Sequence, residues 1–140
     1  MDKIVKNIEE VVLAVKDQAE VVAMFEDLFG LDFKDGWTIA EDRMKVRSAK
    51  IGETQFHIVA SESPDAVIGK FIRDRGEGIH HICFRVNNLD ELIARLKDKG
   101  VRFVPEIPRN GRTSRFIFVH PKSAHGVMIE LIEHNKPEFG

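Results

Sequence analysis

The sequence contains the same pattern twice, and this internal duplication limits the fold more than any other feature does. In each half, an apolar strand-like run precedes a helix-capping residue, an apolar helical face, a glycine and three further strand-like runs. Residues 8–11 match residues 79–82, and the cap candidate Asp17 matches Asn88. Because the features also follow one another in the same order, the sequence predicts two βαβββ modules in tandem.

Local patterns predict where the elements of each module lie. The expected strands cover about residues 10–15, 31–38, 44–50, 54–60, 79–86, 101–104, 115–119 and 127–132. The helices follow the first strand of each half and end near Gly30 and Gly100. We therefore expect an α+β fold of the glyoxalase, or vicinal oxygen chelate, type, with mixed curved sheets around a cleft. One domain would span residues 1–140, with module one at about 7–62, a connector at about 63–77 and module two at about 78–134.

Composition narrows the class of protein. A chain of 140 residues with 43% hydrophobic and 31% charged residues has the composition of an ordinary globular domain. There is no basic block for nucleic acid, no apolar run long enough to cross a membrane and no pattern of a secretory signal. The single cysteine, Cys83, excludes an intramolecular disulfide and is expected in the core. We therefore expect a cytoplasmic protein with a small-molecule partner.

Four residues at positions related by the repeat form the candidate site. Glu10 and His57 lie on the first and last strands of one half, and His81 and Glu130 hold the equivalent positions in the other. Two imidazoles and two carboxylates are suitable ligands for one divalent metal, such as zinc, cobalt, nickel, iron or manganese. Glu130 is the most informative of the four, because a carboxylate in an otherwise apolar strand is costly without a partner.

Each candidate also has a purely structural explanation. Glu10 can be a surface charge on an edge strand, and His57 a half-buried structural histidine. Strand alternation allows only one of His80 and His81 to face the site, and the repeat selects His81. His80 is then a structural residue or a support for a ligand. His134, close to the C-terminus, is expected to be solvated.

Several segments carry a resemblance to a known family. Gly76–Phe84, His120–Ser123 and Gly126–Leu131 resemble signature segments of the methylmalonyl-CoA epimerases, and Ser63–Gly76 resembles their connector. This family is part of the vicinal oxygen chelate (glyoxalase/bleomycin resistance) superfamily. The resemblance covers nearly the whole chain and implies a homodimer that binds a divalent metal, often cobalt. It also implies racemisation of methylmalonyl-CoA at the carbon between the thioester and the carboxylate.

The resemblance assigns the ligands residue by residue. His81 and Glu130 match two metal ligands of the family directly. Position 57 is His where the family has Gln or Glu, and position 10 is Glu where the family has His. The set Glu10, His57, His81 and Glu130 therefore keeps two imidazoles and two carboxylates with the types exchanged. Cobalt is the metal that the resemblance favours, with zinc, manganese and nickel as alternatives.

The resemblance also implies the acid–base groups. Glu41 stands at the position of the family's catalytic base, although Asp42 and Arg43 replace the Gln and Gly that follow it there. We expect Glu41 and Glu130 to move the proton, with Glu130 also a ligand. The cations Lys70, Arg112 and Lys122 are candidates for contacts with coenzyme A phosphates, or simply surface charges.

These expectations combine into a metal-dependent epimerase that removes a proton next to the thioester carbonyl of an acyl-CoA. Two alternatives stay open. A glyoxalase I-type isomerase is the first, because two His and two carboxylates resemble the ligand set of glyoxalase I. A non-catalytic protein that binds a small molecule is the second, since one scaffold serves many activities in this superfamily.

Overall fold

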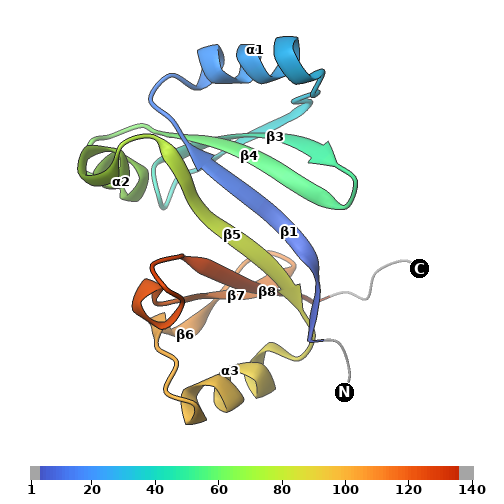
Figure 1. Cartoon of the computed structure of the whole chain (residues 1–140), viewed down its shortest axis with the longest axis vertical. Coiled ribbons are helices and arrows are strands. Elements are labelled where there is room, and N and C mark those ends of the chain that lie inside the picture. The colour runs from blue at the N-terminus through green and yellow to red at the C-terminus, as the bar shows by residue number, and fades with distance from the viewer. Residues whose placement is uncertain (1–3, 136–140) are drawn as a thin grey trace. The chain divides into compact units, whose positions relative to one another are not determined.

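The computed structural model describes residues 4–135, in which the order strand, helix and three strands occurs twice (Figure 1). The elements are β1 (Val5–Ala14), α1 (Gln18–Phe29), β2 (Asp35–Ile39), β3 (Met44–Ile51), β4 (Thr54–Ser61), α2 (Val67–Arg75), β5 (Gly78–Val86), α3 (Leu89–Asp98), β6 (Phe103–Asn110), β7 (Ser114–Val119), the short 3-10 helix η1 (Pro121–Ser123) and β8 (Ile129–His134). This order confirms the predicted α+β fold with tandem βαβββ modules, and α2 lies in the connector between them.

The described chain divides into two compact units. The N-terminal unit comprises Glu10–His80, and the C-terminal unit comprises residues 4–9 together with 81–135. The strand order is β2-β3-β4-β1 for the first module and β5-β8-β7-β6 for the second. In each module the first and last strands pair in parallel and the other pairs are antiparallel, so the pairing is mixed as expected.

The register of the parallel strand pairs is itself repeated. Val12 on β1 is the partner of His57 on β4, and Cys83 on β5 is the partner of Glu130 on β8. These two pairs are matched by the same alignment that relates the halves of the sequence. The duplication therefore places His57 and Glu130 at equivalent positions of their modules.

The helix starts follow the sequence prediction. Asp17 accepts a hydrogen bond from the Glu20 N–H at 3.1 Å, and Asn88 accepts one from the Glu91 N–H at 3.4 Å. Each bond satisfies a backbone donor that the first turn of a helix leaves without an intrahelical partner. Gly30, with a φ of 67°, closes α1 in the left-handed conformation that glycine adopts without steric cost.

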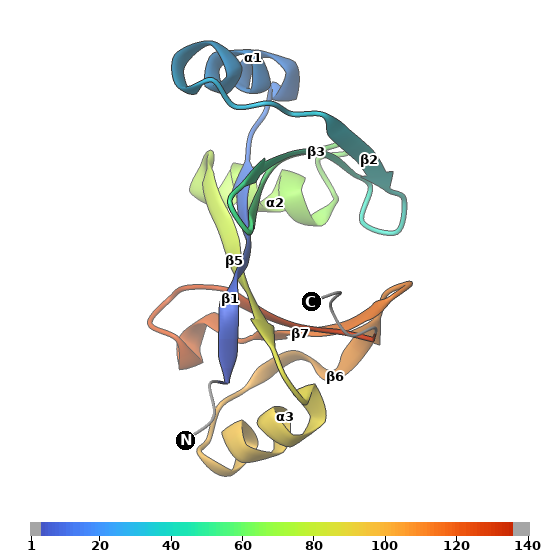
Figure 2. The same cartoon turned by 90° about the vertical axis from the view of Figure 1, so that its right-hand side faces the viewer.

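In the N-terminal unit, α1 and α2 cover opposite faces of the strands (Figures 1 and 2). The core under α1 contains Val15, Val22, Phe33, Ala49 and Ile58. The core under α2 contains Val12, Ala14, Val46, Val59 and Ile68. Because side chains alternate along a strand, His57 lies on the same face of β4 as Val59, the face that α2 partly covers.

In the C-terminal unit, α3 packs on one face of the strands. Its core contains Val86, Leu89, Leu92, Ile93, Phe103, Ile117, Val119 and Leu131. Alternation directs Glu130, the neighbour of Leu131, to the opposite face of β8. Cys83 is fully buried in the core, as expected. Within residues 4–135, no helix is long and apolar enough to span a bilayer.

Candidate metal centre

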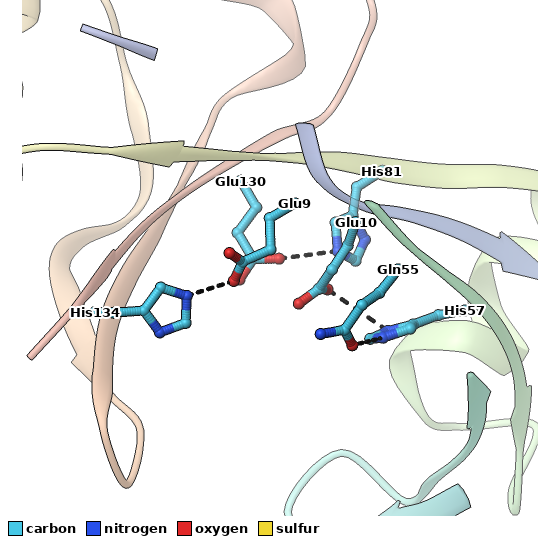
Figure 3. A network of polar contacts seen from close by, with 7 residues as sticks. All are labelled: Glu9, Glu10, Gln55, His57, His81, Glu130 and His134. Atoms are coloured by element: carbon cyan, nitrogen blue, oxygen red, sulfur yellow. Dashed lines mark hydrogen bonds and ion pairs between the residues drawn. The ribbon is translucent and has the colours of Figure 1, made fainter. Parts of the chain in front are cut away.

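Glu10 and His57 lie side by side in the N-terminal unit. The β1–β4 register makes Gln55 the partner of Glu10 and Val12 the partner of His57, so the four residues share one face of the pair. Glu10 Oε1 is 3.5 Å from His57 Nδ1 (Figure 3), and the two side chains are 19% and 8% exposed. A strand pairing that is local to this unit thus brings together two of the predicted ligands.

The His57 ring is held by neighbours that the sequence did not reveal. Its Nε2 atom is 3.1 Å from Gln55 Oε1. The Trp37 ring packs edge-on against the imidazole, with 5.3 Å between centroids and an interplanar angle of 85°. Ser48, its register partner on β3, is buried. Gln55 is two residues from His57 on a strand, and this spacing was a sequence signal that could have identified it.

His81 and Glu130 form the corresponding pair in the C-terminal unit. His81 Nε2 is 3.0 Å from Glu130 Oε1 (Figure 3), and each side chain is 10% exposed. The Phe118 ring packs edge-on against His81 at 5.2 Å between centroids, and Phe118 is also the register partner of Glu130. The surroundings of this pair are therefore largely apolar.

Burial decides the ionisation of this second pair. The pKa of Glu130 is raised to about 7, mainly by desolvation. The charge of Glu9 also raises this pKa, whereas a hydrogen bond with Cys83 and the charge of Arg109 lower it. Desolvation also lowers the pKa of His81 to about 4. Between these two values the carboxyl group holds a proton and the imidazole is neutral, so a cation bound there would take the place of that proton.

The C-terminal unit has a second histidine–glutamate contact, which lies on the same face of β8 as Glu130. His134 Nε2 is 2.6 Å from Glu9 Oε2 (Figure 3), and the side chains are 31% and 12% exposed. The expectation that His134 is solvated was wrong, because β8 continues as far as this residue and alternation directs it to the side of Glu130. Glu9 is also the residue whose charge acts on Glu130.

Glu41 lies in the exposed turn of residues 40–43, which joins β2 to β3. The register pairs Ile39 with Met44 at this turn, whereas the β3 partner of His57 is Ser48. Ser48 is four residues farther along the strand than Met44, a separation of about 13 Å. The β3–β4 register therefore separates the Glu41 turn from His57 along the strands of their shared unit.

The remaining candidates lie outside these pairs. His80 packs edge-on against Phe71 of α2, with 4.9 Å between the ring centroids, and this contact agrees with a structural role. The three cations proposed for coenzyme A phosphates, Lys70, Arg112 and Lys122, are exposed. Their exposure fits either a surface charge or contact with a soluble ligand.

The donor atoms in each unit fit a divalent metal. With metal–ligand bonds of about 2.1 Å, two adjacent ligand atoms lie about 3.0 Å apart at a right angle and about 3.4 Å apart at a tetrahedral angle. The observed separations are 3.0 Å for His81 and Glu130 and 3.5 Å for His57 and Glu10. Imidazole nitrogen with carboxylate oxygen suits zinc, cobalt, nickel or manganese. Each pair can therefore supply two neighbouring ligands.

Comparison with known proteins places this geometry in context. Residues 7–131 match the Glyoxalase/Bleomycin resistance protein/Dioxygenase superfamily. Mitochondrial methylmalonyl-CoA epimerase of Homo sapiens is 28% identical over 127 residues, which are 89% of this chain and 72% of that protein.

Solved structures agree with the sequence comparison. Methylmalonyl-CoA epimerase from Mycobacterium tuberculosis is 31% identical, with a TM-score of 0.86 over 98% of this chain and 93% of that one. A variant of the Streptomyces coelicolor methylmalonyl-CoA epimerase, in complex with 2-nitronate-propionyl-CoA, is 29% identical, with a TM-score of 0.87 over 97% and 99%. These similarities confirm the predicted resemblance to methylmalonyl-CoA epimerases and the predicted fold class.

Proposed function

Because the chain belongs to the Glyoxalase/Bleomycin resistance protein/Dioxygenase superfamily, we propose that it is a metal-dependent epimerase of an acyl-CoA, with methylmalonyl-CoA as the first candidate. The similarity described above confirms the expectation of an epimerase-like enzyme. The observation that carries the metal-dependent reaction is the histidine–glutamate pair in each unit, buried in the C-terminal unit and partly buried in the N-terminal unit, with ligand spacing in both. The acyl-CoA analogue in the Streptomyces coelicolor complex supports the class of substrate.

We propose Glu10, His57, His81 and Glu130 as the ligands of one divalent metal. Their positions are related by the repeat, and each half contributes one imidazole and one carboxylate. Cobalt is the first candidate by resemblance, with zinc, manganese and nickel as alternatives. When bound, the cation would supply Lewis-acid stabilisation of the negative charge that develops on the substrate's carbonyl oxygen.

The chain's own side chains would move the proton. On the resemblance alone, and not on the β3–β4 register that separates its turn from His57, we assign removal of this proton from the carbon between the thioester and the carboxylate to Glu41. The electron pair of that C–H bond shifts towards the thioester carbonyl oxygen. A proton then returns to the carbon on its other face, which inverts its configuration. We assign this step to Glu130, which would first take that proton from solvent, because a bound cation displaces the proton that its carboxyl group holds in the metal-free protein. Positioned acid–base groups of this kind contribute about 10²–10⁴-fold each.

The test is exchange of the substrate's α-proton with solvent deuterium, measured by mass spectrometry on metal-loaded protein. We expect the wild type to incorporate deuterium, and Glu41→Gln to lose at least about 100-fold in exchange rate while its metal content stays unchanged. Glu53→Gln, in the exposed turn between β3 and β4, is the matched control and should exchange normally. Normal exchange by Glu41→Gln rejects Glu41 as the base, and no exchange by the metal-loaded wild type rejects the epimerase.

A glyoxalase I-type isomerase is the second candidate, because each unit pairs one histidine with one glutamate. The same preparation should be given the hemithioacetal of methylglyoxal as substrate. Turnover of this compound without turnover of methylmalonyl-CoA would select the second candidate. If the protein binds no metal and turns over neither compound, the third candidate, a non-catalytic binding protein, would be favoured.

We also propose that the protein is a cytoplasmic homodimer, as the resemblance and the sequence imply. Light scattering coupled to gel filtration would measure its mass against the 16.0 kDa of one chain. A mass of one chain at micromolar concentration would reject the dimer.

A further inference from the structure

We propose that Gln55 is a positioning residue, which fixes the tautomer of His57 and directs the lone pair of Nδ1 towards Glu10. The last step of this inference, that Nδ1 is the metal-binding atom, rests on the proposed function. The tautomer itself is a property of the metal-free protein. No role was assigned to Gln55 from the sequence, and this residue is exposed on β4.

Two distances decide which ring nitrogen carries the proton. His57 Nε2 and Gln55 Oε1 are 3.1 Å apart, within the range of an N–H···O hydrogen bond. His57 Nδ1 and Glu10 Oε1 are 3.5 Å apart, beyond that range. With the Gln55 amide in this orientation its oxygen faces the ring, and because an amide oxygen only accepts hydrogen bonds, Nε2 is then the donor. A neutral imidazole has one N–H, and Nδ1 therefore keeps its lone pair on the side of Glu10.

The strands of the N-terminal unit determine this arrangement. Gln55 and His57 are two residues apart on β4, and Glu10 is the register partner of Gln55 on β1, so the three side chains share one face. Figure 3 shows the Gln55 amide oxygen and the Glu10 carboxylate both directed at the imidazole of His57. The edge-on Trp37 ring and the 8% exposure of His57 restrict rotation of the imidazole.

A fixed tautomer matters because a metal binds the ring nitrogen that has the lone pair. A hydrogen bond to the other nitrogen orients the ring and increases the basicity of the ligand, and loss of such a partner costs about 10–100-fold in metal affinity. Gln55 is exposed, so its replacement should leave the folded structure intact. Its effect would then be seen in the tautomer and in metal affinity rather than in stability.

The experiment is two-bond ¹H–¹⁵N correlation NMR of the histidine rings in the metal-free protein, with His57→Gln used to assign the signals. We expect Nε2 of His57 to be protonated and Nδ1 to be unprotonated in the wild type. Addition of Zn²⁺ should shift the Nδ1 resonance. Gln55→Leu, which removes the acceptor, should mix the two tautomers and weaken Zn²⁺ binding about 10–100-fold in a chelator competition. Gln55→Glu retains the acceptor and should restore the wild-type tautomer and affinity.

Protonation of Nδ1 in the metal-free wild type would overturn the inference, as would wild-type Zn²⁺ affinity in Gln55→Leu. These failures leave the proposed function standing, since the protein would still bind metal. A wild type that binds neither Zn²⁺ nor Co²⁺ would remove the proposed function, and ligation by Nδ1 would be overturned with it. Thermal unfolding of the variants shows whether any change in affinity comes from loss of folding.

Discussion

At the scale of single residues, burial separates the His81–Glu130 pair from an ordinary ion pair. Arg115 and Asp90 also touch, through two hydrogen bonds of 2.9 Å, but the arginine mainly lowers the pKa of Asp90 because this pair is exposed to solvent. For Glu130 the largest effect is desolvation, which raises the pKa to about 7. A buried carboxyl group of this kind is costly for the fold unless a proton or a cation accompanies it.

This cost predicts how stability depends on pH in the metal-free protein. The pKa of Glu130 rises from an ordinary 4.5 to about 7 on folding, so the unfolded state ionises first as the pH increases. The stability that the protonated carboxyl contributes is complete below 4.5 and is lost as the pH rises through about 7. The Gln side chain of Glu130→Gln cannot ionise. The free energy of unfolding of this variant should therefore increase relative to that of the wild type as the pH rises from 4.5 to about 7.

The comparison with Glu130→Gln is needed because His81 acts in the opposite direction. Its pKa falls from 6.5 to about 4 on folding, so its contribution is present above 6.5 and is lost as the pH falls through about 4. Urea unfolding of both proteins in the presence of a chelator measures the difference at each pH. Parallel profiles for the two proteins would contradict the raised pKa of Glu130.

At the scale of elements, the repeat made most of the fold predictable, and the deviations have physical causes. β1 begins at Val5 rather than near residue 10, because the polar Glu9 interrupts the apolar pattern by which the strand was recognised. β6 continues to Asn110, although the sequence favoured an end at residue 104. Pro105 cannot donate to a strand partner, but β6 is an edge strand, where a missing donor is tolerated.

Only those site residues that occupy equivalent positions in the two repeats could be predicted from the sequence. Glu10 and His57 were found because His81 and Glu130 hold the equivalent positions, and each module pairs its two residues by strand register. The contact of Trp37 with His57 depends on β2 pairing with β3, and no local pattern in the sequence reveals that pairing. The sequence therefore identifies candidate ligands more readily than the residues that orient them.

An element-scale prediction concerns Gly69, which lies inside α2. Gly to Ala in a helix interior usually stabilises by roughly 0.5–1 kcal/mol. Here the added Cβ would overlap the Ser63 carbonyl oxygen and lie 2.8 Å from Pro64 Cα, and both are backbone atoms that cannot move away cheaply. Gly69→Ala should therefore destabilise the protein, by about 1–3 kcal/mol.

Gly78→Ala is the matched control for this change. Gly78 begins β5, and a Cβ placed there meets no atom within 4 Å. This substitution should be neutral or stabilise by up to about 1 kcal/mol, through the lower entropy of the unfolded chain. Chemical denaturation of both variants and the wild type gives the two differences. A Gly69→Ala variant as stable as Gly78→Ala would show that the connector adjusts freely.

At the scale of the whole molecule, the division into two units gives the four-ligand proposal a direct consequence. Of the four proposed ligands, Glu10 and His57 lie in the N-terminal unit and His81 and Glu130 in the C-terminal unit, so each unit supplies two of the donor atoms. Structural and catalytic zinc sites use three or four protein ligands. A metal that draws on both pairs would bind the folded chain tightly, whereas a metal held by one pair would bind weakly.

We therefore expect metal-dependent stabilisation to be lost on substitution in either unit. At a hundredfold excess of free metal over Kd, binding should add about 2.7 kcal/mol to the free energy of unfolding and raise Tm by roughly 10 °C, both reversed by a chelator. Glu10→Gln in the N-terminal unit and Glu130→Gln in the C-terminal unit should each remove most of this shift, while Glu53→Gln keeps it. Calorimetric scans with and without Co²⁺ or Zn²⁺ measure the shift. If one of the two variants kept the full shift, the metal would be held without that residue and the shared site would be rejected, because a lost ligand must weaken binding to the folded state.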